Sequence, residues 1–190
     1  MPRTFMDAKV FVIPIPKENV MNRIRGLVLL AIIVCCVLPY AAIGQTKIVE
    51  KEGGFSFTAP KGWTVRTMSG LKYKIAVGPI TSSFAVNINV VDEKFKGTVE
   101  QYSKGNQATL TKILPGYKKV SESPFQTALK LKGIKLVFTS KPQGKPLGQT
   151  AYCFRGKNET MFVVTCTSML DVAPKYSKTF DETMKTFALL

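Results

Sequence analysis

Two pairs of neighbouring carboxylates are the first candidates for acid/base chemistry: Asp92 with Glu93, and Asp181 with Glu182. That chemistry needs two carboxyl groups that converge on one substrate. Neighbours in sequence point apart on a strand or a helix, so neither pair predicts a catalytic dyad.

Other catalytic groups are scarce. Histidine is absent from the 190 residues, which removes the usual general base near neutral pH and the commonest metal ligand. Ser69 and Lys72 have the spacing of a Ser-x-x-Lys nucleophile motif, but they fall between two expected strands and not at the start of a helix. The sequence therefore predicts no catalytic residue, no cofactor and no metal site.

Cys153 and Cys166 lie on neighbouring strands of one expected hairpin. If Lys157 and Asn158 form a two-residue turn, the two thiols share a sheet face but lie about 13 Å apart along the strands. A disulfide requires a longer loop, near residues 158–161. We favour two buried thiols that behave as small apolar side chains, and the disulfide stays open as the alternative.

Two asparagines alternate with apolar residues on one expected strand. Asn87 and Asn89 face away from Phe84, Val86 and Ile88, so both amides point the same way. They form a possible polar surface that could orient a ligand. The simpler interpretation is that they are the ordinary solvent-facing residues of a half-buried strand.

Five lysines form a second candidate site, a possible anionic contact. They flank one predicted hairpin and the loop that follows it, and they are Lys130, Lys132, Lys135, Lys141 and Lys145. If the two ends of the hairpin are close, these side chains build a cationic edge. Edge strands also carry lysine to prevent unwanted strand pairing, and that alternative has the greater weight.

The elements that would position these residues follow from periodicity and turn residues. Strands are expected at 55–58, 63–65, 72–77, 84–91, 125–131, 134–140, 147–154 and 161–167. Thr98 and Gln101 form a capping box, which predicts a helix that ends at Leu114. Asp171 is expected to cap a final helix with Pro174 in its first turn. The fold class is therefore α+β, an antiparallel sheet with helices.

The N-terminal region has the organisation of an export signal. A basic start at Met21, an apolar run from Leu27 to Leu38 and the small-x-small residues 42–44 predict cleavage before Gln45. The alternative is an uncleaved anchor, because 27–43 approaches membrane-spanning length. We expect residues 1–20 to be a mis-assigned extension, 21–44 the signal peptide, and 45–190 one globular domain that works outside the cytoplasm, in the periplasm or beyond the cell.

The charge of the domain indicates its class of partner. The chain has 27 basic and 12 acidic residues; five and two of these precede residue 45, which leaves 22 and 10 after it and a net charge of +12. That balance favours anionic partners, although scattered lysine also serves solubility. Nucleic acid is disfavoured by the export signal.

The wording of two segments resembles a known family. Near the start of the domain the sequence has Phe55-x-Phe57-x-Ala59-Pro60-x-Gly62-Trp63, and residues 162–167 precede a final helix that ends in Phe187. The arrangement resembles the PsbP-like domains, which include photosystem II PsbP, DcrB-type bacterial envelope proteins and a Ran-GTPase-binding nuclear protein. The resemblance covers residues 53–190 and implies an antiparallel sheet between helical layers.

The same resemblance implies a function of protein binding or stabilisation, with no catalytic residues to carry over. The histidines that photosynthetic members use for metals have no counterpart here. We expect an exported, non-enzymatic domain that contacts an envelope protein or an anionic surface. A small-ligand or lipid-binding module that uses a cavity between sheet and helix is the alternative, and a hydrolase-type enzyme comes third.

Overall fold

The computed structural model describes residues 44–82 and 84–190. The predicted extension at 1–20 and nearly all of the predicted export segment lie outside these residues. In the described part of the chain neither helix is long and apolar enough to cross a membrane.

Two antiparallel sheets and two helices make up the fold, which confirms the α+β class. The larger sheet has the order β3-β4-β5-β9-β8-β7-β6, and the smaller has the order β1-β2-β10. The strands are β1 (Lys47–Glu50), β2 (Phe55–Thr58), β3 (Thr64–Arg66), β4 (Ile75–Thr81), β5 (Phe84–Lys94), β6 (Lys118–Gln126), β7 (Lys132–Ser140), β8 (Leu147–Arg155), β9 (Thr160–Met169) and β10 (Ala188–Leu189). The helices are α1 (Val99–Ile113) and α2 (Ala173–Lys185).

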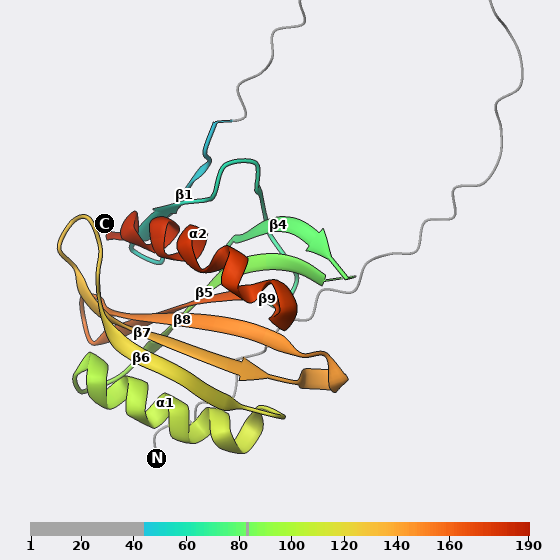
Figure 1. Ribbon diagram of the computed structural model, residues 1–190. Helices are drawn as coiled ribbons and strands as arrows, with labels where there is room; N and C mark the ends of the chain where they lie inside the picture. Colours follow the sequence, from blue (N-terminus) through green and yellow to red (C-terminus); the bar gives the residue numbers. More distant parts are fainter. Residues whose placement is uncertain (1–43, 83) are drawn as a thin grey trace, which may run out of the picture.

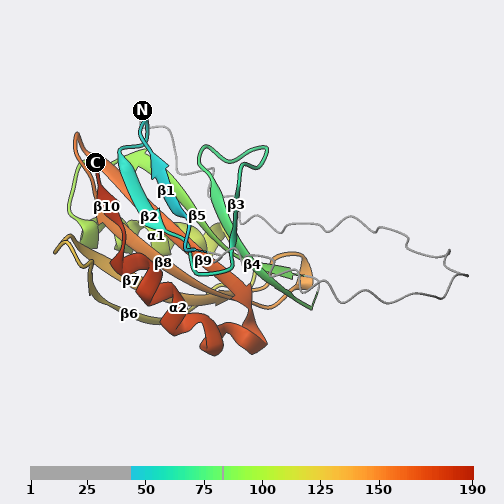
Figure 2. The same ribbon diagram turned by 90° about the horizontal axis from the view of Figure 1, so that it is seen from above.

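The helices cover opposite faces of the larger sheet (Figure 1). Tyr102 and Leu110 of α1 pack on one face, against Phe138 and Ala151. Phe180 of α2 packs on the other face in a cluster that includes the small sheet. The three short strands of that sheet lie side by side in Figure 2. The result is the predicted sheet between two layers.

Helix α1 begins where the capping box predicts. Thr98 accepts a hydrogen bond from the Gln101 amide, and the Gln101 side chain accepts one from the Thr98 amide. These contacts satisfy two donors that the first helical turn leaves open. The prediction for α2 was less accurate: Pro174 lies in its first turn, but Val172 is the N-cap and Asp171 lies in a short 3-10 turn, Leu170–Val172.

The β6–β7 hairpin differs from the predicted one. The sequence places a strand at 125–131 and a turn at Lys132-Gly133, whereas β6 ends at Gln126 and the turn lies within 127–131. The alternating pattern at 125–131 is typical of a strand, but Lys130 adopts a φ of 65°, which breaks the extended backbone. Strand β6 was missed because it is an edge strand with an exposed, polar sequence that has little apolar periodicity.

Candidate functional site

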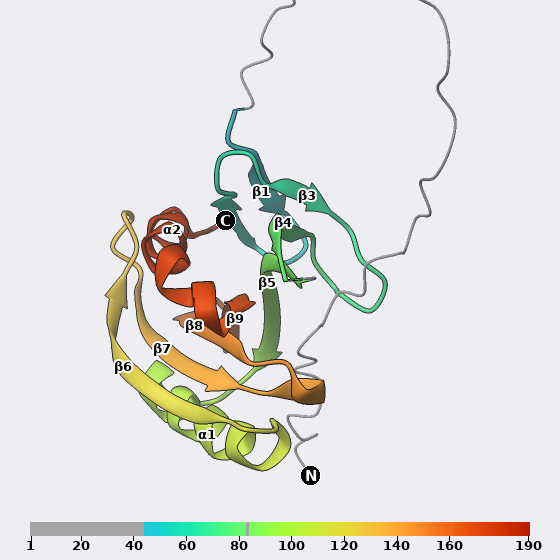
Figure 3. The same ribbon diagram turned by 45° about the vertical axis from the view of Figure 1, so that its right-hand side comes forward.

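The five predicted lysines do not form one continuous edge. Lys132 is the first residue of β7 and Lys130 lies just before it, whereas Lys141 follows the last residue of the strand. Nine residues of strand span roughly 30 Å, so the two groups lie at opposite ends of the larger sheet. Figure 3 shows β6 and β7 extended side by side along this length.

Lys135 is occupied by an internal ion pair. Its Nζ lies 2.6 Å from Asp181 Oδ1 and 2.8 Å from Oδ2, and only 16% of its side chain is exposed. Tyr152 donates a second hydrogen bond to Asp181 Oδ1 at 2.6 Å. Burial of Tyr152 raises the pKa of its hydroxyl, and the hydrogen bond to Asp181 adds to this effect. These contacts join α2 to the sheet. The Lys135 ammonium group is therefore largely inaccessible to a partner.

Residues 127–131 form a hydrogen-bonded loop, the hairpin tip. Thr127 N donates to Leu131 O at 3.0 Å, and Leu131 N donates to Thr127 Oγ1 at 3.2 Å. Ala128 N donates to the carbonyl oxygen of Lys185 at 2.7 Å, and Lys185 is the last residue of α2. The tip projects past the sheet beside the C-terminal end of α2 (Figure 1). It carries Lys130 on a fixed backbone.

Lys141 and Lys145 lie near the C-terminal end of α1. Lys141 N donates to Pro115 O at 2.7 Å, which joins the loop after β7 to the turn after α1. Lys118 starts β6 nearby, since its register partner on β7 is Thr139. In the described part of the chain none of these three lysines makes a side-chain ion pair.

The two asparagines differ in their surroundings. Asn87 is 4% exposed, so the interpretation of a solvent-facing side chain is wrong for this residue. Its Nδ2 donates to Ala85 O at 3.0 Å, and its neighbour across the ladder is Thr167, which is also buried. Asn89 is partly exposed and pairs with Thr165. The Asn87 and Thr167 pair therefore lies inside the fold, where β5 is an interior strand of the sheet.

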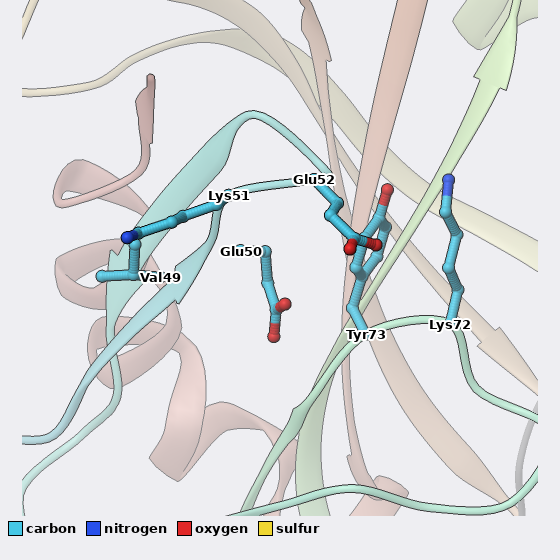
Figure 4. A pocket seen from close by; sticks show the side chains of 6 residues that line it. All are labelled: Val49, Glu50, Lys51, Glu52, Lys72 and Tyr73. Atoms are coloured by element: carbon cyan, nitrogen blue, oxygen red, sulfur yellow. The ribbon is translucent and has the colours of Figure 1, made fainter.

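A shallow pocket of about 340 Å³ lies at the β1–β2 turn (Figure 4). Its lining mixes charges and one aromatic ring: Val49, Glu50, Lys51, Glu52, Lys72 and Tyr73. Lys72 of the Ser-x-x-Lys segment lies here in a bidentate contact with Asp92, at 2.8 and 2.9 Å. A lysine held by a carboxylate in this way is charged and cannot act as the base for a serine.

Both carboxylate pairs diverge, as the sequence predicts. Asp92 contacts Lys72, whereas Glu93 accepts a hydrogen bond from Tyr102 of α1. Burial raises the pKa of Glu93 above its ordinary value of 4.5. In the second pair Asp181 faces the sheet, while Glu182 is exposed. Among the described residues no group of three or more His, Cys, Asp or Glu side chains could hold a metal ion.

The structure settles the alternatives for Cys153 and Cys166. Both are buried free thiols. Their register partners are Val163 and Thr150, so the residues lie on opposite faces of the sheet, one in each core cluster. The expected two-residue turn was wrong by one position, because Gly156 N donates to Thr160 O and encloses three residues. This one-residue change reverses which face a side chain occupies.

Sequence reasoning missed Leu129 in the hairpin tip. Leu129 is 73% exposed, the largest exposed fraction among the large hydrophobic residues of the described chain. The signal was present: an apolar residue in a short segment with Lys130 and Lys132 and no acidic neighbour. Because a strand was expected at 125–131, Leu129 was assigned to a sheet and its exposure was not predicted.

Solved structures share this arrangement of strands and helices. The solution structure of cyanobacterial PsbP from Synechocystis sp. PCC 6803 matches 80% of this chain and 96% of its own, with a TM-score of 0.57 and 10% identity. The chain has the PsbP-like fold. LpqN, involved in cell envelope biogenesis of Mycobacterium tuberculosis, shares it at a TM-score of 0.56 and 13% identity, over 77% of this chain and 90% of LpqN.

A Ran-binding protein extends the range of PsbP-like structures. The Saccharomyces cerevisiae Ran-binding protein Mog1p matches 77% of this chain and 96% of its own, with a TM-score of 0.53 and 9% identity. No protein-family model matches the sequence, and no curated protein matches it. At these identities the likeness concerns the fold, and the function must be argued from the surface.

Proposed function

We propose that the chain is exported and that residues 45–190 are a non-enzymatic binding domain for a protein or an anionic surface of the bacterial envelope. The observation that carries the proposal is the pair of lysine groups at the two ends of β7. Unlike Lys135, Lys130, Lys132, Lys141 and Lys145 make no side-chain ion pair within residues 44–82 and 84–190. Unpaired cations on a domain with excess positive charge favour anionic partners.

The alternative of a ligand cavity between sheet and helix has less support. Aromatic rings fill the contact between α2 and the core: the ring centroid of Trp63 lies 6.3 Å from Tyr176 and 6.4 Å from Phe180. The pocket at the β1–β2 turn is elsewhere and has a charged lining. An apolar ligand site needs a concave apolar lining, and this pocket does not have one. The comparison favours the surface-binding proposal.

Charge reversal tests the proposal. Lys130→Glu with Lys132→Glu, and separately Lys141→Glu with Lys145→Glu, should weaken capture of envelope components from an extract. Lys61→Glu with Lys175→Glu, two exposed lysines without a side-chain ion pair in the described chain, is the matched control for the change of net charge. Capture by the parent should also weaken between 0.1 M and 1 M salt, as the Debye length falls from about 10 Å to about 3 Å. Capture that ignores salt and both lysine pairs would mean that these lysines only keep the domain soluble.

The export part has its own test. Expression of the full chain in a bacterium should yield a product outside the cytoplasm whose first residue is Gln45, as N-terminal sequencing would show. An intact Met21 start in the membrane fraction would replace the signal peptide with an anchor. A product that stays in the cytoplasm would overturn export itself.

A further inference from the structure

We propose that the hairpin tip docks on an anionic lipid bilayer, with Leu129 inserted among the headgroups. This inference rests on the proposed function and assigns its anionic surface to lipid. The chemistry is that of an exposed apolar side chain surrounded by cations. Leu129 is 73% exposed and lies next to Lys130. Apolar side chains gain by leaving water for the acyl boundary, while nearby lysines attract anionic headgroups.

The cations around Leu129 come from two elements. Lys130 and Lys132 belong to the hairpin, and Lys185 belongs to the end of α2, held beside the tip by the hydrogen bond from Ala128 N. All three lysines are solvent-accessible, and none makes a side-chain ion pair within the described chain. Residues 126–132 and 185–187 contain no acidic residue. The charged side chains of these two segments are therefore all positive.

The backbone of the hairpin tip also needs no rearrangement before Leu129 inserts. The tip is closed by the hydrogen bonds of Thr127 with Leu131, and Gln126 Nε2 donates to Lys130 O at 3.4 Å. A loop already fixed in one conformation loses little conformational entropy when it binds.

The described chain begins at the same end of the domain. Lys47 of β1 pairs with Thr58, and Thr58 N donates to Thr186 Oγ1 at 2.9 Å. Thr186 follows Lys185, whose carbonyl accepts from the tip. The predicted first residue of the exported product, Gln45, therefore lies on the side that carries Leu129.

Tryptophan fluorescence tests the insertion. Leu129→Trp and, as control, Ile80→Trp are made in the full chain, and the exported product is mixed with phosphatidylglycerol/phosphatidylcholine vesicles or with phosphatidylcholine alone. Ile80 is 62% exposed at the opposite end of the larger sheet. The emission of the Leu129→Trp variant should shift to shorter wavelength with the anionic vesicles only, after subtraction of the parent signal from Trp63. Ile80→Trp should show no shift.

Binding measurements provide the second readout. Leu129→Ser should weaken partition onto the anionic vesicles about tenfold, whereas Ile80→Ser should leave it unchanged. A shift at position 80, no shift at 129, or equal partition of the two serine variants would overturn the inference. If capture of envelope components still depends on salt and on the lysine pairs, the proposed function survives that result. If that capture is absent too, both fail.

Discussion

The indole ring of Trp63 lies directly against the backbone of Gly78, so close that a Cβ on Gly78 would come within 2.4 Å of the ring. Any side chain larger than hydrogen at position 78 must displace the indole. The ring also packs edge-on against Tyr176 and Phe180 of α2. Gly78 thus allows β4, Trp63 and α2 to pack together.

Trp63→Ala should destabilise the fold by about 3 kcal/mol, through the loss of a large packed aromatic. Gly78→Ala should cost about 1–3 kcal/mol in the parent, because the ring must move. In the Trp63→Ala background the same Gly78→Ala change should cost almost nothing. Urea unfolding of the four proteins measures this coupling. Additive costs would mean that the contact is not the reason for the glycine.

Asn87→Ala and Asn89→Ala should have different effects. Asn87 is buried and hydrogen-bonded to Ala85 O, and its loss should cost about 1–2 kcal/mol. Asn89 is partly exposed, so its replacement should change stability by less than about 0.5 kcal/mol. Thermal unfolding of the two variants compares them directly. Equal melting temperatures would contradict the burial argument.

Glu93 should make stability depend on pH. Because burial raises its pKa in the folded state, the folded protein binds more protons than the unfolded chain just above pH 4.5. Stability contributed by this group is therefore lost as pH rises from about 4.5 through the folded pKa. Glu93→Gln keeps an acceptor for Tyr102 and removes the titration.

The measurement for Glu93 is the melting temperature of parent and Glu93→Gln between about pH 4 and pH 8. The difference should grow in favour of the glutamine variant as pH rises. Glu122→Gln is the control: the hydrogen bond from Lys119 lowers the pKa of Glu122, so this variant should not gain on the parent as pH rises. Parallel curves for parent and Glu93→Gln would show that Glu93 titrates normally.

Cys153 and Cys166 should be alkylated without prior reduction, but only in denaturant. Burial raises the pKa of Cys153 to about 12 and that of Cys166 well above its ordinary value of 9.0. The folded thiols should therefore react slowly, because the thiolate is the nucleophile. Peptide mapping by mass spectrometry checks both positions. A disulfide-linked peptide that contains the two cysteines would contradict the register.

Local signals in the sequence predicted what local interactions determine. The capping box at Thr98 needs only residues within one helical turn, and it placed α1 correctly. The alternation of β5 was also visible, but the burial of Asn87 depends on β4 and β9 lying on both sides of it. Strand β6 and the position of Leu129 depend on which residues pair with β7. Such pairing is a long-range property that no short window of sequence contains.

Residues 187–190 complete the small sheet that the first described strands begin. Phe187 is fully buried and stacks on Phe154 at 4.7 Å, and Leu190 N donates to Gly54 O at 2.9 Å. Thr58 and Thr186 form a hydrogen bond although they lie 128 positions apart in the sequence. Closing so long a loop is entropically costly and slow. During synthesis the aromatic core must therefore stay open until residue 187 has emerged, so the domain completes its fold only when its last strand is available.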